Sequence, residues 1–174
     1  MSQPIIDVSD FEAGMNGWEF KFWMPPGRKA SMKIIEGEGF RSRHLLQFDA
    51  DGQDDDGIFF IQKSFASDVE GPWTWAFVSW WLRVEGLTKL NSWPRVVYLG
   101  PPKDLAKMET QHSFHWFAGQ DGLITCPTCG DWYGHMFKAE FSEGIDTLQV
   151  CVGWKINWET RRTLFIDDVL VRAT

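Results

Sequence analysis

Cysteine, tyrosine and basic side chains are scarce in this sequence of 174 residues. It has 3 Cys and 2 Tyr, and its 17 Lys and Arg stand against 24 Asp and Glu, which gives a net charge of −7. Three cysteines are too few for a disulfide scaffold. The negative charge argues against a surface that tracks phosphate groups, so we expect no nucleic-acid partner.

Long hydrophobic runs and helical periodicity are also missing. The longest apolar run, Trp73 to Leu82, is well short of the roughly 20 residues that cross a bilayer, so no membrane partner is expected. The N-terminus lacks the basic segment and apolar stretch of a signal peptide. No window keeps a helical apolar stripe free of Gly or Pro, and we expect Pro102 to Gln111 to form a loop with at most one helical turn.

Tryptophan and phenylalanine are abundant instead, with 11 Trp and 14 Phe. Short runs of β-branched and aromatic residues recur between turn-like clusters of Gly, Pro, Asn and Asp. The runs cover residues 5–11, 18–23, 31–35, 44–48, 58–65, 75–84, 95–99, 113–117, 136–141, 147–152 and 164–171. Many short strands without crossover helices predict an all-β fold, an antiparallel β-sandwich of the jelly-roll type. The length fits one domain over residues 1–174.

Alternation along two of these runs assigns side chains to faces. In the run 75–84 the wholly apolar set, which should face the core, is Val78, Trp80, Leu82 and Val84. The mixed set, which should face outward, is Phe77, Ser79, Trp81 and Arg83. In the run 147–152 the same logic buries Leu148, Val150 and Val152 and turns Gln149 and Cys151 outward.

The number of tryptophans exceeds what a core of this size readily absorbs, although about half of them suit an ordinary sandwich core. Exposed indoles beside polar groups are what a sugar-binding site needs, because they stack on the C–H faces of sugar rings while neighbours bond the hydroxyls. The candidate ligand-binding residues are Trp75, Trp81, Arg83, Trp93, Tyr98, Trp116, Trp132, Gln149 and Trp158. The net charge favours a neutral β-glycan, unless Arg83 and Arg95 form a local positive patch.

Two sets of residues have the chemistry of metal ligands. Cys126 and Cys129 have the spacing of a zinc knuckle, and His112 and His115 would complete four ligands; a disulfide or two free thiols are the alternatives. The carboxylates Glu12, Asp167 and Asp168 lie on the first and last predicted strands, which a jelly roll can bring side by side. With backbone carbonyls of residues 36–42 they would suit Ca²⁺, and the alternative is a solvated acidic sheet edge.

Three segments carry a family resemblance: Asp10-Phe11-Glu12-Ala13-Gly14 followed by Trp18, the run from Phe77 to Val84, and the closing run from Phe165 to Val171. Together they resemble the β-jelly-roll carbohydrate-binding modules of the galactose-binding-domain-like type. The resemblance implies two antiparallel sheets, a structural calcium with Glu12 and Asp168 among its ligands, and polysaccharide bound on a concave sheet face or at loop tips. It also implies an origin in a multidomain, secreted polysaccharide-degrading enzyme, and hence an extracellular location.

Two further functions stay open on the same scaffold. A glycoside hydrolase would need a pair of carboxylates, for which Glu140 and Glu143 are the candidates by default. A polysaccharide lyase would draw its base and its neutralising group from Tyr98, Tyr133, His115, His135 and Arg83. The third function is a protein-interaction domain of a surface or phage assembly, using the exposed aromatic residues. Our principal hypothesis is a noncatalytic module that binds a polysaccharide or oligosaccharide.

Overall fold

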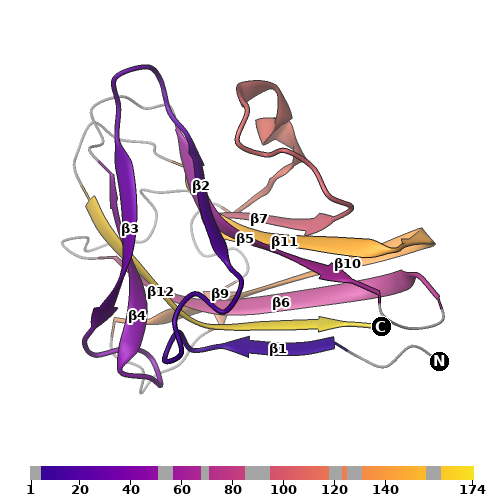
Figure 1. Cartoon of the computed structure of the whole chain (residues 1–174), viewed down its shortest axis with the longest axis horizontal. Coiled ribbons are helices and arrows are strands. Elements are labelled where there is room, and N and C mark those ends of the chain that lie inside the picture. Colours follow the sequence, from indigo (N-terminus) through magenta and orange to yellow (C-terminus); the bar gives the residue numbers. More distant parts are fainter. Residues whose placement is uncertain are drawn as a thin grey trace.

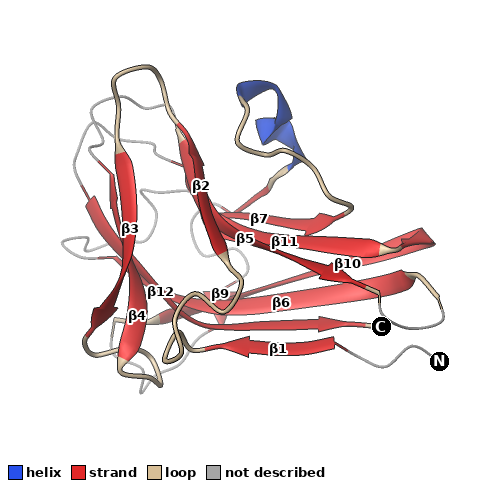
Figure 2. Cartoon of the chain, viewed as in Figure 1, coloured by secondary structure: helices blue, strands red, loops and turns tan. Residues whose placement is uncertain are grey.

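Two antiparallel sheets packed face to face form the molecule in the computed structural model (Figure 1). The structure describes residues 5–50, 57–67, 71–84, 95–117, 123–124, 131–155 and 162–174. Strands make up nearly all of its regular structure (Figure 2), and no helix within these ranges is long and apolar enough to cross a membrane. The predicted all-β sandwich of the jelly-roll type is confirmed.

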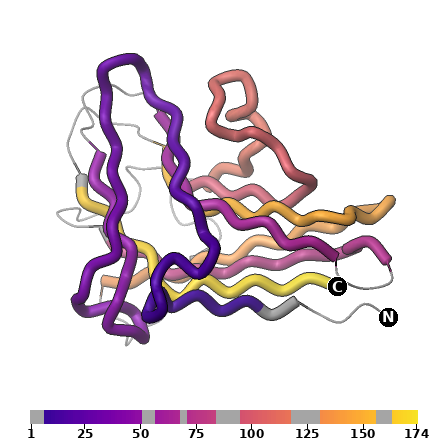
Figure 3. Tube along the Cα trace, in the orientation of Figure 1, coloured from indigo at the N-terminus to yellow at the C-terminus, as the bar shows by residue number. Residues whose placement is uncertain are grey.

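Sheet A contains both ends of the described chain. Its strands, in spatial order, are β3 (Ala30–Glu36), β4 (His44–Ala50), β12 (Arg162–Ala173), β6 (Trp73–Val84), β10 (Tyr133–Ile145) and β9 (Leu123–Ile124), and β1 (Ile5–Ser9) pairs with β12. β1 runs antiparallel to the end of β12, from the pair Ile5 and Ala173 to the pair Ser9 and Val169. The described chain therefore begins and ends side by side, on β1 and β12, at the same end of the sandwich (Figure 3).

Sheet B is narrower. Its strands, in spatial order, are β2 (Glu19–Trp23), β5 (Ile58–Ala66), β11 (Thr147–Lys155), β7 (Arg95–Gly100) and β8 (His115–Phe117). Each neighbouring pair in this order is antiparallel. All of the predicted strand runs are present, and only the two-residue β9 has no counterpart among them.

The core between the sheets follows the alternation of the sequence. On β6 the side chains of Val78, Trp80 and Leu82 are fully buried, as predicted, against Val150 and Val152 of β11 and their neighbours. Large rings fill much of this layer, and pairs such as Phe48 and Trp154 meet edge to face at 5.5 Å between ring centroids. Burial of such rings is the main source of stability in a sandwich of this kind.

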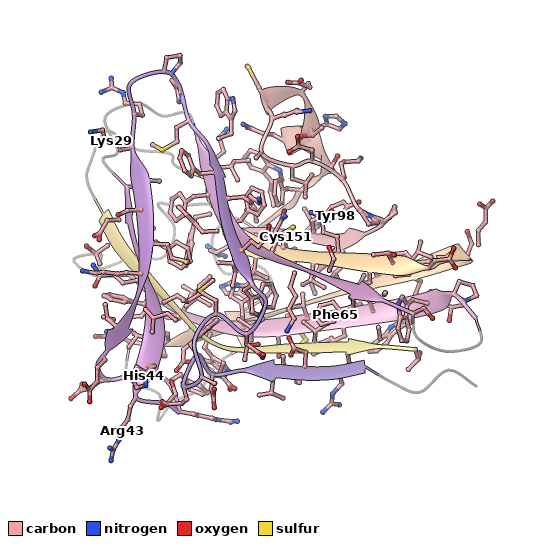
Figure 4. All side chains as sticks on the ribbon, viewed as in Figure 1. Lys29, Arg43, His44, Phe65, Tyr98 and Cys151 are labelled. Carbon is pink, nitrogen blue, oxygen red and sulfur yellow. The ribbon has the colours of Figure 1, made fainter. Side chains whose placement is uncertain are left out.

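A second, smaller core lies on the opposite side of sheet B. Gln149 and Cys151 point away from the inter-sheet core, as predicted, but they are buried rather than exposed, at 3% and 0%. The segment 101–117 covers them by placing Leu105 and Phe114 on the apolar outer face of β5, β7 and β11. Figure 4 shows Tyr98 and Cys151 side by side beneath this segment.

Polar contacts fix the segment 101–117 to the sheet. The Tyr98 hydroxyl donates to the Pro101 carbonyl at 2.7 Å, and the Lys103 N–H donates to Gln149 Oε1 at 2.5 Å. The expected helical turn is a 3-10 helix, η2 (Met108–Ser113), which begins later than predicted and lies at the far end of the segment (Figure 2). The segment closes the middle of the outer face of sheet B.

One titratable side chain, His135 of β10, lies inside the inter-sheet core. It is fully buried, its ring is 5.3 Å from that of Trp80, and neither ring nitrogen has a hydrogen-bond partner among the described residues. Burial, and secondarily the charge of Arg95, lowers the pKa of His135 to about 3. The imidazole is therefore neutral in the folded protein at ordinary pH.

This burial predicts a pH dependence of stability. Below a pH of about 6.5 the unfolded chain binds a proton at His135 that the folded chain does not, so the free energy of unfolding should fall by about 1.4 kcal/mol per pH unit as the pH drops from 6.5 toward 3. Urea unfolding at pH 7.5, 6 and 5 measures the slope. His135→Leu should remove this part of the slope, whereas His112→Gln, at an exposed position, should keep it; equal slopes in all three proteins would contradict the assignment.

Candidate carbohydrate-binding face

The outer face of sheet A is the sheet surface that the described part of the chain leaves partly open. Along β6 it carries alternate residues, namely Trp75, Phe77, Ser79, Trp81 and Arg83, as predicted from the sequence. Antiparallel pairing places residues of both β10 and β12 beside Phe77, Ser79 and Trp81, a residue of β10 beside Trp75 and a residue of β12 beside Arg83. This row of side chains divides into a closed half and an open half.

The closed half surrounds Trp81 and Arg83. The Phe40 ring stacks on Trp81 with 3.7 Å between centroids and 12° between planes. The Arg83 guanidinium lies 5.1 Å from the Trp132 ring and 4.5 Å from the Phe165 ring. The structure thus brings the predicted residues Trp81, Arg83 and Trp132 together, but their aromatic faces are occupied by one another and by their protein neighbours.

The open half surrounds Trp75 and Phe77, both half-buried, with their rings 7° from parallel and their centroids 6.2 Å apart. Glu140 of β10 pairs with Trp75, and Phe77 lies between Lys138 of β10 and Arg172 of β12. All three charged side chains are exposed. Rings that can stack and charges that can bond hydroxyl groups therefore share one surface.

An apolar border adjoins the open half. Ser79, the next residue of the row, pairs with Met136 and Leu170, and Val8 lies opposite Leu170 on β1. Met136 is 47% exposed and Val8 is 53% exposed, so this border is also accessible. We call the five residues of the open half the β6 platform; they are Trp75, Phe77, Lys138, Glu140 and Arg172, without the apolar border.

The remaining predicted ligand-binding residues lie elsewhere. Tyr98 and Gln149 are on the outer face of sheet B, under the segment 101–117, with exposures of 8% and 3%. Trp116 is on the same side, 38% exposed, with the Lys155 ammonium 4.6 Å from its ring. Trp93 and Trp158 lie outside the described residues. The predicted set is therefore divided between opposite faces of the sandwich.

The predicted calcium carboxylates do converge, on the loop that joins β3 to β4. Asp167 is fully buried and accepts hydrogen bonds from the Phe40 N–H at 2.7 Å and from the Ser42 hydroxyl at 2.9 Å. Glu12 accepts from the backbone N–H groups of Arg43 and His44, and its other oxygen lies 2.9 Å from His44 Nδ1 (Figure 4 labels Arg43 and His44). These carboxylates anchor the loop that places Phe40 on Trp81.

This donor set does not fit calcium. A Ca²⁺ ion needs oxygen ligands, whereas Glu12 and Asp167 face N–H and O–H donors, and Asp168 pairs with Arg41 at 3.7 Å. In the described ranges, no group of three or more His, Cys, Asp or Glu side chains could hold a metal ion. The hydrogen bond with His44 lowers the pKa of Glu12, while burial raises the pKa of Asp167 and of Asp168.

The zinc hypothesis stays a prediction. His112 lies in η2 and His115 on β8, both exposed, while Cys126 and Cys129 lie outside the described residues. The His115 ring stacks on that of Phe137 at 4.8 Å between centroids.

The candidate catalytic residues do not form a common site in the part of the chain that the structure describes. His135 is buried in the core, and Tyr98 lies on the outer face of sheet B, where burial raises its pKa. Arg83 and the half-exposed Tyr133 belong to sheet A. Glu140 and Glu143 are both exposed residues of β10.

Sequence reasoning missed four members of the β6 platform as ligand-binding candidates: Phe77, Lys138, Arg172 and Glu140, which it named only as a possible catalytic carboxylate. Phe77 was recognisable, since alternation already turned it outward beside Trp75. Lys138 and Arg172 required the register of β6 with two strands that are far away in the sequence. Residue type alone does not distinguish them from other exposed cations.

Comparison with known proteins finds similarity in structure only. No family model matches the sequence, and no curated protein does. The CBM22-1 xylan-binding domain of Xyn10C from Paenibacillus barcinonensis aligns with a TM-score of 0.58 at 11% identity, over 99% of this chain and 97% of that domain. TmCBM61, solved with beta-1,4-galactotriose, aligns with a TM-score of 0.52 at 13% identity, over 95% of each chain. The fold is that of the β-sandwich carbohydrate-binding modules.

A third match supports the same fold. The family 11 carbohydrate-binding module of Lic26A-Cel5E from Clostridium thermocellum aligns with a TM-score of 0.52 at 13% identity, over 95% of this chain and 92% of that module. Each of these three module structures aligns with 95–99% of the present chain.

The anchoring of the β3–β4 loop predicts a loss of stability in Asp167→Ala. This change leaves the partly buried Phe40 N–H without its acceptor, while the Ser42 hydroxyl keeps only the His44 carbonyl, to which it donates at 2.7 Å. The free energy of unfolding should fall by about 1–3 kcal/mol. Urea unfolding at pH 7 measures it. Glu38→Ala, an exposed carboxylate in the same loop, is the matched control and should change stability little; an equal loss in both variants would contradict the anchoring role.

The contacts of these carboxylates also predict indifference to calcium. The melting temperature in 2 mM CaCl₂ should match that in 2 mM EDTA to within about 1 °C. A ligand that binds only the folded state raises the melting temperature, but each of the three carboxylates already has a protein partner. Differential scanning fluorimetry on metal-stripped protein makes the comparison. A rise of several degrees with CaCl₂ would restore the calcium hypothesis.

Proposed function

We propose that the protein is a noncatalytic carbohydrate-binding module that holds a polysaccharide on the β6 platform. The observation that carries this proposal is the pairing of two half-exposed aromatic rings, Trp75 and Phe77, with three exposed charged side chains on one open sheet face. The fold, shared with modules that bind xylan and galactotriose, supports it.

The chemistry of the platform suits a pyranose chain. The axial C–H bonds of a β-linked sugar form an apolar face that packs on an aromatic ring, and each ring contact excludes water from both surfaces. The hydroxyl groups at the edges of the sugar can accept from Lys138 and Arg172 and donate to Glu140. Rings provide affinity in such a site, and the polar edge selects the sugar.

Access favours this face over the outer face of sheet B. There the apolar surface of Phe60, Val96 and Tyr98 is already covered by Leu105 and Phe114. A glycan could reach Trp116 at its border but could not lie across the middle of the sheet. The platform offers an accessible aromatic pair, Trp75 and Phe77, on an open sheet surface.

The proposed ligand is a β-glycan with a neutral backbone, as expected for a protein with a net charge of −7. We place the module in a larger extracellular enzyme that degrades such a polymer, where reversible binding would keep the catalytic domain near its substrate. The matched xylan-binding domain is likewise one part of a larger protein, Xyn10C.

Affinity electrophoresis through gels that contain soluble xylans, galactans, mannans or β-glucans tests the function. Trp75→Ala and Phe77→Ala should each lower the association constant for the retarding glycan about 10-fold, since the loss of a stacked ring costs roughly 1–2 kcal/mol. Isothermal titration calorimetry with an oligosaccharide of that glycan measures the change.

Trp116→Ala is the matched control, because it removes a comparably exposed indole from the opposite face of the sandwich. It should leave retardation unchanged. If Trp116→Ala abolishes binding while Trp75→Ala does not, the site lies on the side of sheet B. New reducing ends in the gel would show an enzyme, and unchanged migration in every gel would remove the glycan hypothesis and favour a protein partner.

A further inference from the structure

The β6 platform also contains a recognition element for an acidic group. We propose that it prefers β-glycans whose backbone carries uronic-acid substituents, with Lys138 and Arg172 binding the carboxylate beside Phe77 and the backbone sugar lying over Trp75. This inference rests on the proposed function and adds the class of polysaccharide that the site selects.

The first observation is that Lys138 and Arg172 form no ion pair with any described residue. Other basic side chains of the molecule do so: Lys63 pairs with Asp7 at 3.0 Å and Lys107 with Asp104 at 3.0 Å. Lys138 and Arg172 are both exposed, so their charges are available to a ligand.

The second observation is their placement by the register of the sheet. Phe77 pairs with Lys138 on one side and with Arg172 on the other, so one aromatic ring has a cation on each flank. Directly opposed residues of antiparallel strands have Cβ atoms about 5 Å apart, which keeps both cations within reach of a sugar stacked on the ring. A guanidinium binds a carboxylate through two parallel hydrogen bonds, and an ammonium adds a second charge.

The third observation is the position of the negative charge. Glu140 pairs with Trp75, whereas Lys138 and Arg172 both pair with Phe77. The Glu140 carboxylate therefore lies at the opposite end of the platform from Arg172, and two residues along β10 from Lys138. It would repel a carboxylate over Trp75 and accept hydrogen bonds from neutral hydroxyl groups there. The platform is thus polarised, and a substituted chain has one favourable direction on it.

The charge distribution of the rest of the protein supports this location. Among the arginines that the sequence offered for a positive patch, Arg95 is fully buried and Arg83 is held between the rings of Trp132 and Phe165. Neither can present a charge on an open sheet face. In a protein with a net charge of −7, a surface with two cations and one carboxylate is a local exception that favours an anionic group.

The test compares one polymer with and without its acid groups. Glucuronoxylan oligosaccharides and the same oligosaccharides after chemical reduction of the carboxyl group are titrated by calorimetry at 20 mM and 500 mM NaCl. We expect the acidic form to bind about 3- to 10-fold more tightly at low salt, as two exposed ion pairs would give, and the difference to disappear at high salt.

The double variant Lys138→Gln/Arg172→Gln should bind the acidic and the reduced forms equally at 20 mM NaCl, because the amide side chains can still donate to hydroxyl groups but carry no charge. Lys33→Gln, an exposed cation on β3 at the edge of the same sheet, is the matched control for the loss of charge and should keep the preference. Circular dichroism and urea unfolding verify that each variant is folded.

The outcomes separate the two proposals. Equal binding of both forms by the unmodified protein, with loss of both in Trp75→Ala, would overturn the acidic preference and leave the proposed function standing. A preference that survives in the double variant would overturn the role of Lys138 and Arg172. Binding of neither form, together with unchanged migration in every glycan gel, would overturn both proposals.

Discussion

The packing of large rings between the two sheets is the interaction on which the rest of this structure depends. Trp80 from sheet A and Trp154 from sheet B fill the layer together with the phenylalanines around them. On each strand, the side chains that point into this layer belong to every second residue. Because side chains alternate, the burial of one set determines which residues the other set presents. The position of Trp75 and Phe77 on the outside of β6 follows directly from the burial of Ala76 and Val78 on the inside.

The same rule exposes two outer faces, and the protein treats them differently. On sheet B the outward residues are themselves apolar, including Phe60 and Val96, and the segment 101–117 folds back to cover them. On sheet A the outward row is closed over Trp81 by Phe40 and left open over Trp75. The difference lies in two connections, each anchored by buried polar groups: Gln149 for the segment 101–117 and Asp167 for the β3–β4 loop.

The alternation of the sequence was sufficient to predict the sandwich, its strands and the two sides of β6. It was not sufficient to predict the site, because the β3–β4 loop and the segment 101–117, which cover parts of the two sheet faces, are held there by contacts between residues far apart in the chain. The sequence placed Asp167 beside the loop 36–42, but it indicated carbonyl ligands shared with calcium and not a hydrogen bond from the Phe40 N–H, 127 positions away. Leu105 is an isolated apolar residue in a polar stretch and Phe114 belongs to a run that predicts only a strand, so the burial of Tyr98 and Gln149 beneath them could not be predicted. The carboxylates were expected to gather, and they do, but the groups that they meet are N–H and O–H donors.

A β-bulge in β12 separates the part of this strand that pairs with β4 from the part that pairs with β1. Asp168 adopts a left-handed conformation, with φ of 52°, where the pairing with β6 is interrupted between Asp167 and Leu170. Before this bulge β12 pairs with β4, and after it with β1. The additional residue reverses the alternation, so that Asp167 points outward and Val169 inward. If the chain kept its length but lost the bulge, β12 could place either Asp167 above the β3–β4 loop or Val169 and Val171 in the core, but not both.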